Sequence, residues 1–273
     1  MSEDQSQQSA VALTPESAIA SLRSPDLSQR YYAAWWLGKM RVREAVDALI
    51  VALEDNDDRT DLGGYPLRRI AARALGKLGN PSAIPALLKS LSCEDFYVRE
   101  AAAQAIEAIA ASSPESFNAA QVCTATLTRL LQSKVIDSVK LEQPYEAILE
   151  ALGRLKAVSS QTAVEPYLQH RLPRIRFAAA RAMYGLTGAS EYAELLVKGL
   201  EDPDINLRQA VLTDLGEIGY LPAVEAIAQC QTENSFKLFA LKSILDMHLP
   251  KAQFDLSLTE PLQQVMLYMD DLL

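Results

Sequence analysis

A segment that recurs roughly every 30 residues constrains this chain more than any other feature. Each copy reads apolar–Arg–x–x–Ala–x–x–Ala–apolar and usually closes on Gly, as the stretch from Leu67 to Gly76 does. A period of this length is typical of stacked arrays, in which each unit packs only on its neighbours. Aromatic residues make up only 7% of the chain, Ala and Leu dominate, and no segment shows a convincing period-two alternation. We therefore expect an almost purely helical array.

Aligning the copies on the residue that ends the first helix of each unit gives the register of the array. Those end residues are Leu37, Leu75, Ile106, Leu152, Met183, Leu215 and Ile244. Seven positions earlier stand Arg30, Arg68, Arg99, Tyr145, Arg176, Arg208 and Lys237, which we call the ladder residues. An Asp that can cap the helix precedes three of them by four residues, at Asp26, Asp95 and Asp204. The Arg can bridge to a neighbouring loop or Asp, and this Asp/Arg pattern resembles HEAT repeats.

The predicted fold class is all-α: a right-handed α-solenoid of about six to seven HEAT-like helical hairpins. We expect a single domain over residues 14–273, preceded by a disordered N-terminus at residues 1–13. The period lengthens at residues 54–66 and again at 112–143, and the second stretch predicts an extended helix around Ala119 to Leu131. After Pro250 an apolar stripe either caps the last repeat or offers a docking face.

Composition excludes several classes of function. Because its formal net charge is −9, we do not expect the chain to bind nucleic acid in general. No apolar run approaches the roughly 18 to 20 residues that cross a bilayer, and the polar start lacks the pattern of an export signal. The three cysteines, Cys93, Cys123 and Cys230, are far apart and odd in number, which argues against a disulfide framework. We therefore expect a cytoplasmic protein.

The usual catalytic apparatus is scarce. A HEAT-like array can be a metal enzyme such as deoxyhypusine hydroxylase, but this chain has two histidines and no His-Glu dipeptide. We interpret His170 and His248 as surface or helix-end residues, and we expect no metal and no cofactor. The acidic stretch 55–61 does not fit a calcium loop, because Arg59 and Thr60 occupy ligand and glycine positions. We interpret Cys93 as a structural cysteine, with transient attachment of a ligand as the alternative.

Four large aromatic residues lie within six positions of one predicted helix, in a chain that is otherwise poor in them. They are Tyr31, Tyr32, Trp35 and Trp36. Helical spacing places Tyr31 with Trp35 on one face and Tyr32 with Trp36 on the next. We expect one pair in the core and the other on an exposed surface, where a planar partner can stack. In the competing interpretation, all four pack against the N-terminal helix as part of a capping repeat.

A second unusual segment follows in the next unit. Two glycines precede Tyr65, Pro66 and Leu67, and then come Arg68 and Arg69. Arg68 is a ladder residue and so is expected to be structural, whereas Arg69 is off the ladder and freer to clamp a carboxylate. Tyr97 repeats the aromatic-plus-Arg theme in the third unit. Aromatic, guanidinium and acidic groups together suit a tetrapyrrole, and the same set also suits a peptide.

Three segments resemble the E subunit of the E/F-type phycobilin lyases. These are residues 30–39 (RYYAAWWLGK), the loop segment 54–69 around DRTDLGGYPLRR, and residues 95–104 (DFYVREAAAQ). The resemblance is dense from about Ser24 to Ala105, and the remaining chain agrees in length and repeat layout. The segments include residues that the repeat pattern does not require, so they are more specific than that pattern alone.

The resemblance implies a subunit that pairs with a smaller, HEAT-like F subunit. The pair would attach phycocyanobilin, as substrate, through a thioether to a cysteine of the apo-phycocyanin alpha subunit, and could also transfer it back. Within that expectation, the bilin-binding candidates are Tyr31, Tyr32, Trp35, Trp36, Arg59, Tyr65, Arg68, Arg69 and Tyr97. Asp58 and Asp61 are the candidates for the pyrrole protons.

Two alternatives stay open. The first keeps the family and changes the chemistry to a lyase-isomerase subunit for phycoerythrocyanin. The second is an adaptor that docks peptides and has no part in bilin chemistry.

Overall fold

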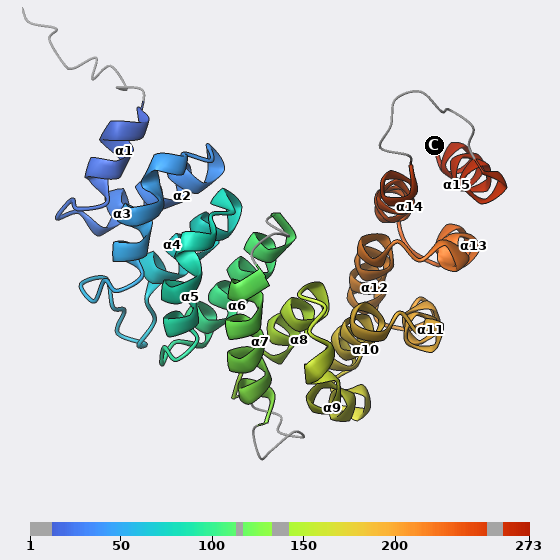
Figure 1. Ribbon diagram of the computed structural model, residues 1–273. Coiled ribbons are helices and arrows are strands. Elements are labelled where there is room, and N and C mark those ends of the chain that lie inside the picture. The colour runs from blue at the N-terminus through green and yellow to red at the C-terminus, as the bar shows by residue number, and fades with distance from the viewer. Residues whose placement is uncertain (1–12, 113–116, 133–141, 250–258) are drawn as a thin grey trace, which may run out of the picture. The chain divides into compact units, whose positions relative to one another are not determined.

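The computed structural model describes residues 13–112, 117–132, 142–249 and 259–273, and within those ranges it contains helices and turns but no strand. The chain divides into two compact units, Met1–Ser116 and Phe117–Leu273. The helices of the first are α1 (Pro15–Ser21), α2 (Leu27–Lys39), α3 (Val46–Ala52), α4 (Pro66–Leu78), α5 (Ile84–Ser90) and α6 (Phe96–Ser112) (Figure 1). Short 3-10 turns, Arg43–Ala45 and Pro81–Ala83, lead into α3 and α5.

The second unit continues the same alternation of helices. Its longer helices are α7 (Phe117–Leu131), α8 (Tyr145–Arg154), α10 (Pro173–Thr187), α11 (Ser190–Gly199), α12 (Ile205–Ile218), α14 (Asn234–His248) and α15 (Glu260–Asp271). Shorter pieces are α9 (Gln161–Val164) and α13 (Val224–Gln229), with 3-10 turns at Val158–Ser160, Glu165–Gln169 and Leu221–Ala223. Figure 1 shows α10, α12 and α14 in one layer of this unit and α11, α13 and α15 in the other. The predicted all-α hairpin architecture is confirmed.

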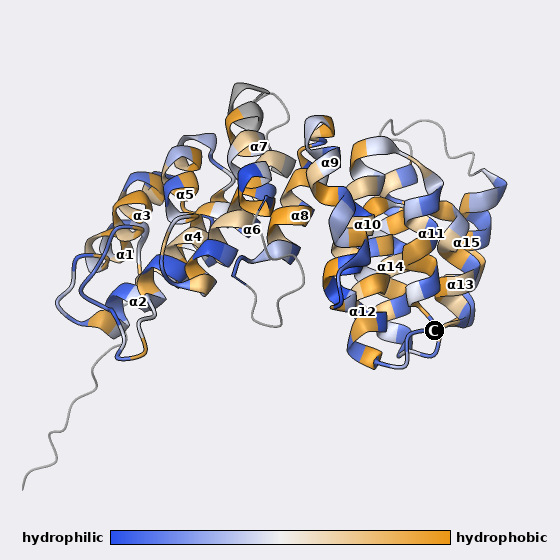
Figure 2. Cartoon of the chain, turned by 90° about the horizontal axis from the view of Figure 1, so that it is seen from below, coloured by the Kyte–Doolittle hydropathy of each residue, from blue (hydrophilic) through white to orange (hydrophobic). Residues whose placement is uncertain are grey.

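The core of each unit lies between its two layers of helices. Leu37, Leu75 and Ile106, which we expected to end the first helices, are fully buried, but the helices run beyond them to Lys39, Leu78 and Ser112. Alanines fill the seams where α2 packs on α4 and α4 packs on α6, because their small side chains allow close helix approach. Figure 2 shows the resulting pattern, in which hydrophobic stretches recur along the helices of each unit and are interrupted by hydrophilic residues.

Local sequence signals set the helix ends. Asp26 and Asp204 cap α2 and α12 by accepting hydrogen bonds from backbone N–H groups, as their positions predicted. Thr14 begins α1 in a reciprocal capping box with Ser17. At the other ends of helices, Gly79 takes a left-handed conformation with φ of 67°, which stops α4 and starts the turn.

Two further expectations concern the longer segments. The extended helix around Ala119 to Leu131 is present as α7. The apolar stripe after Pro250 forms α15, which buries Leu262 and Val265 against α13 and α14 and so caps the last repeat. The expected disordered segment, residues 1–13, lies outside the described residues except for its last member. The expectation that residues 14–273 behave as a single domain stays a prediction.

Candidate functional site

Three ladder arginines, Arg99, Arg176 and Arg208, hold the turns that precede their own helices. Their guanidinium groups donate to backbone carbonyl oxygens that the helix start leaves within reach. These bonds run from Arg99 to Cys93 and Glu94, from Arg176 to His170 and Arg171, and from Arg208 to Asp202 and Pro203, at 2.6–3.2 Å. The recurring Arg therefore stabilises the fold and does not by itself indicate a ligand site.

Two ladder arginines in the first unit converge on the acidic loop between α3 and α4. Arg30 is buried and pairs with the Asp55 carboxylate at 2.5 Å. Arg68 donates through Nε to the Asp55 carbonyl at 2.6 Å and through Nη2 to Asn56 at 2.5 Å. Its guanidinium also lies 4.1 Å from the centre of the Tyr65 ring. The expected structural role of Arg68 is borne out by these contacts.

Asp58 lies in the same loop and is buried. One of its carboxylate oxygens accepts a 2.7 Å hydrogen bond from the Leu67 N–H in the first turn of α4. The other oxygen is buried and has no hydrogen-bond partner among the described residues. Burial raises the pKa of Asp58, and the bond from Leu67 only partly offsets it. By contrast, the Asp61 side chain is exposed and makes no hydrogen bond or ion pair within the described ranges.

A small polar cluster joins this loop to the start of α6. The Tyr65 hydroxyl donates to Glu94 Oε1 at 2.7 Å, and Arg59 pairs with the same oxygen at 3.1 Å. The Tyr65 bond and the Arg59 charge lower the pKa of Glu94, and the bond to Glu94 raises that of Tyr65. Asp95 accepts from the Tyr65 N–H as well as from the first turn of α6. The Arg59 guanidinium is therefore already paired with a carboxylate, and the Tyr65 hydroxyl already has a hydrogen-bond partner within the chain.

The four aromatic residues of α2 form a surface that is partly open to solvent. Tyr31 and Tyr32 are exposed, and Trp35 and Trp36 are half-buried. The Tyr32 and Trp35 rings stack with centroids 5.5 Å apart, and the Lys39 ammonium lies 4.8 Å from the Trp35 ring. The expectation that one aromatic pair is core is wrong, because the core positions of α2 are taken by alanines and Leu37. The ring stack joins Tyr32 to Trp35, at a three-residue spacing, and so links the two helix faces that the sequence distinguished.

A basic stripe runs beside this aromatic surface on the next helix. Arg69, Arg73 and Lys77 lie at four-residue intervals along α4, each 38 residues after Tyr31, Trp35 and Lys39. The two helices are close, because a Cβ added at Gly38 would stand 2.8 Å from Ala74 Cα. The Arg69 guanidinium lies 5.8 Å from the Tyr97 ring on α6, and Tyr97 is 57% exposed. Arg69 and Tyr97 thus lie close together on adjacent helices, and Arg69 occupies the register position of Tyr31 on α2.

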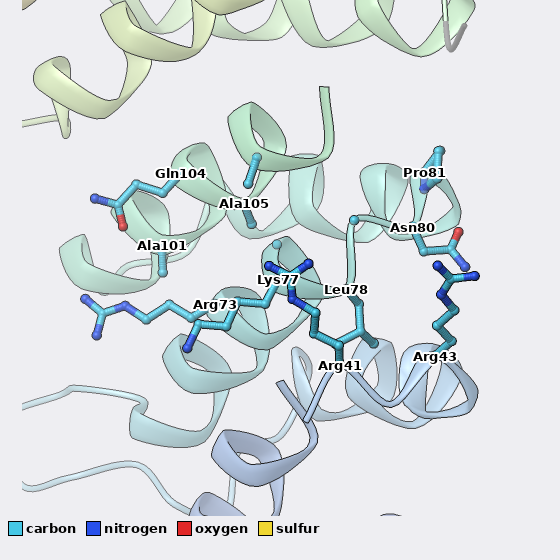
Figure 3. Close-up of a pocket in the computed structure, with 13 residues that line it drawn as sticks. Arg41, Arg43, Arg73, Lys77, Leu78, Asn80, Pro81, Ala101, Gln104 and Ala105 are labelled. Atoms are coloured by element: carbon cyan, nitrogen blue, oxygen red, sulfur yellow. The ribbon is translucent and has the colours of Figure 1, made fainter. Parts of the chain in front are cut away.

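The stripe continues into a groove of about 950 Å³ that sequence reasoning missed. Its basic lining comes from Arg41 and Arg43 after α2 and from Arg73 and Lys77 on α4. Figure 3 shows Arg41, Arg73 and Lys77 gathered beside Ala101, Ala105 and Gln104 of α6, with Arg43 near Asn80. All four cations are exposed, and none has an ion pair within the described part of the chain. We call this the basic groove.

The corresponding place in the second unit is built differently. A groove of about 450 Å³ lies between α8, α10 and α12, and its central cation is Arg181. Arg181 pairs with Asp214 at 3.0 Å, with Glu217 at 2.5 Å and with Glu150 at 3.4 Å. Burial raises the pKa of Asp214 to about 6 in spite of the attraction to Arg181. The central cation of this groove is thus neutralised by the chain itself; of the two other lining cations, Arg154 pairs with Glu217 at 3.0 Å and Lys156 is exposed.

The remaining candidates are the three cysteines and a histidine. Cys93 is half-buried, with its Sγ 3.8 Å from Arg68 Nη1, and Cys123 and Cys230 are buried; all three are free. Burial raises the pKa of the Cys123 thiol to about 11. His170 follows a 3-10 turn and is buried, so of the two expected settings it is the helix-end one. Among the described residues, no three His, Cys, Asp or Glu side chains gather to hold a metal ion.

Comparison with known proteins gives this architecture a family. A model of HEAT repeats matches residues 15–107 and 63–140. The chain is 54% identical over 269 residues to the phycocyanobilin lyase subunit alpha of Nostoc sp. (strain PCC 7120), with 96% of this chain and 94% of the relative covered. The chain belongs to the phycocyanobilin lyase alpha-subunit family. The predicted resemblance is therefore confirmed.

A solved structure and a second relative are also similar to this chain. A structure of the complex of CpcE and CpcF of phycocyanin lyase from Nostoc sp. PCC7120 contains a chain that matches at a TM-score of 0.83 and 52% identity, with both chains covered in full. The bilin biosynthesis protein PecE of Nostoc is 47% identical, with 86% of this chain and 87% of the relative covered. None of the described helices of this family member combines the length and the apolar character that crossing a bilayer requires.

Proposed function

We propose that this chain is the alpha, or E-type, subunit of a heterodimeric lyase that joins phycocyanobilin to a cysteine of the apo-phycocyanin alpha subunit. The observation that carries the proposal is the 54% identity, across nearly the whole chain, to a phycocyanobilin lyase subunit alpha. The match to a chain of the CpcE–CpcF complex supports the pairing with an F-type subunit. The three free cysteines fit a reducing cytoplasm.

The proposed reaction is an addition that needs no leaving group and no oxidant. The acceptor thiolate bonds to the ethylidene carbon of the bilin, the electron pair of the double bond moves into the ring, and the ring takes up one proton. The reverse elimination returns the thiol and the free bilin, so the same pair can transfer the pigment back. The reactive sulfur belongs to the acceptor, and the bilin is a substrate, so the lyase itself needs no cofactor.

The contribution of this chain is to hold the pigment extended and to present its reacting carbon. Fixing two reactants in a productive geometry can supply a large part of a barrier without a catalytic triad. Accessible side chains suit that task, namely Tyr31, Tyr32, Trp35, Trp36, Tyr97 and Arg69, with Asp61 as the acid near the pyrrole nitrogens. Asp58, Arg59, Tyr65 and Arg68 already have partners within the chain, so we propose that they hold the loop in place.

The test is reconstitution with purified components. The chain, an F-type subunit, the apo-alpha subunit and phycocyanobilin are mixed, and pigment that stays on the alpha subunit after denaturation is measured by absorbance. We expect covalent pigment only when both lyase subunits are present. If the pigment produces no spectral shift with or without the F subunit, the adaptor interpretation replaces the proposal.

The lyase-isomerase for phycoerythrocyanin is the alternative; the 47% identity to a protein named bilin biosynthesis protein PecE supports bilin chemistry without naming the reaction. The same reconstitution separates it from the proposal. An alpha subunit that absorbs as attached phycocyanobilin supports the lyase, and a product with a shorter conjugated system supports the isomerising reaction.

A further inference from the structure

The basic groove of the first unit has a charge that the chain leaves unmatched. The protein carries a net charge of −9, yet Arg41, Arg43, Arg73 and Lys77 line one groove with no ion pair within the described residues. Like charges held in a concave surface raise the local potential and attract an anion. We infer that this groove binds the two propionate carboxylates of the bilin. The inference rests on the proposed function and adds the place and chemistry of binding.

The second unit supplies an internal comparison. Aligned on the residues that end the first helices, Arg73 corresponds to Glu150, and Gln104 corresponds to Arg181. In the second unit the two residues form an ion pair with each other, with Glu150 and Arg181 3.4 Å apart. In the first unit the acid is replaced by Arg73, and the facing position on α6 holds a neutral amide. The same place in the repeat is thus internally neutral in one unit and left positive in the other.

The groove also has the size and the neighbours that a linear tetrapyrrole needs. Its volume of about 950 Å³ lies in the range of small-molecule sites. Arg69 and Arg73 continue the same α4 stripe toward Tyr97, and Trp35 occupies the register position of Arg73 on the adjacent α2. A flat conjugated body can therefore lie over aromatic rings while its acid side chains reach the guanidinium and ammonium groups. Arg is suited to this task because it binds carboxylates through two parallel hydrogen bonds.

The decisive experiment first removes the negative charge of the propionates from the ligand and then the positive charge of Arg73 and Lys77 from the protein. Binding of phycocyanobilin and of its dimethyl ester to the assembled E/F pair is titrated by absorbance. We expect the wild-type pair to bind the free acid roughly tenfold to a hundredfold more tightly than the ester, as expected for hydrogen bonds to charged groups. The Arg73→Gln/Lys77→Gln double variant should bind both forms equally and weakly.

Two controls keep the outcome specific. The Arg73→Lys/Lys77→Arg variant conserves the charge and should retain most of the preference for the acid. The Arg23→Gln/Lys198→Gln variant removes the same charge from exposed residues outside the groove and should bind like the wild type. Melting temperatures of all variants, measured by circular dichroism, check that each variant is folded.

Three results would overturn the inference. One is equal binding of acid and ester by a wild-type pair that still transfers pigment, which leaves the proposed function intact. Another is a double variant that binds the bilin normally but loses affinity for the apo-alpha or F subunit, which assigns the groove to an acidic protein surface. A wild-type pair that neither binds nor transfers the pigment removes the proposed function, and the inference with it.

Discussion

Asp58 and Asp61 stand three positions apart in one loop, and the fold gives them opposite surroundings. Asp58 is buried and accepts the Leu67 N–H, whereas Asp61 projects from the loop into solvent. The sequence shows two similar carboxylates, because it contains no information on which of them turns toward the start of α4. Only Asp61 is placed to meet a ligand without disrupting the loop.

The two carboxylates should therefore separate stability from function. Asp58→Ala leaves a backbone N–H at the start of α4 without its partner and should lower the free energy of unfolding by about 1–3 kcal/mol. Asp61→Ala should change that free energy by less than about 0.5 kcal/mol, while it lowers the rate of bilin transfer. Urea unfolding and the reconstituted transfer assay measure the two quantities. Equal stability of Asp58→Ala and the wild type would contradict the structural role.

The sequence predicted some single residues well and missed others for a physical reason. Arg68 was expected to be structural because it repeats, although it was also named as a bilin-binding candidate, and Arg69 was distinguished from it because Arg69 does not repeat. Arg41, Arg43, Arg73 and Lys77 were missed because they come from separate segments that only the packing of α2, α4 and α6 brings together. Their signal in the sequence is weak, since each is an ordinary exposed cation when considered alone.

At the scale of elements, small residues set the distance between the first helices. A Cβ added at Gly76 would stand 2.9 Å from Ala105 Cα, and Gly153 and Gly216 meet Ala182 and Ala240 in the same way. The recurring Gly was visible in the sequence as the residue on which most copies close. The sequence did not show that this Gly lets two helices approach closely, because the alanine that it contacts lies about one repeat further along the chain. The helices and their caps were predicted more reliably, since they depend on nearby residues.

Gly76→Ala tests this role of the small residue. The added methyl would force α4 and α6 apart, and the strain should exceed the gain in helix propensity, with a net loss of about 1–3 kcal/mol. Lys77→Ala, at the next and exposed position, should stay within about 0.5 kcal/mol of the wild type. Thermal or urea unfolding gives both values. A Gly76→Ala protein as stable as the wild type would show that the helices separate without cost.

At the scale of the whole molecule, buried acids make stability depend on pH. Burial raises the pKa of Asp214 to about 6, above its ordinary value of 3.8. Between those values the folded chain keeps a proton that the unfolded chain has lost, so rising pH lowers the free energy of unfolding. The destabilisation that Asp214 causes is absent below pH 3.8 and is complete above pH 6. Arg181 limits that cost because its charge favours the ionised form.

The Asp214→Asn variant should lose this dependence. We expect the stability of the wild type, relative to the variant, to fall between about pH 4 and pH 6 by up to about 3 kcal/mol. Asp246→Asn, which alters an exposed pair with Lys242, should follow the wild-type profile. Unfolding free energies measured across that range decide the matter, and parallel profiles for wild type and Asp214→Asn would contradict the prediction.

The ladder arginines have a consequence for how such a chain can change over time. Arg99, Arg176 and Arg208 bond chiefly to carbonyls five or six residues before them, within their own repeat. A duplicated stretch of gene that includes the turn and its Arg therefore carries both partners of these bonds, while Arg208 adds a bond to the Gln231 carbonyl further along the chain. The chain can lengthen by whole modules while its off-ladder positions are left free to diverge.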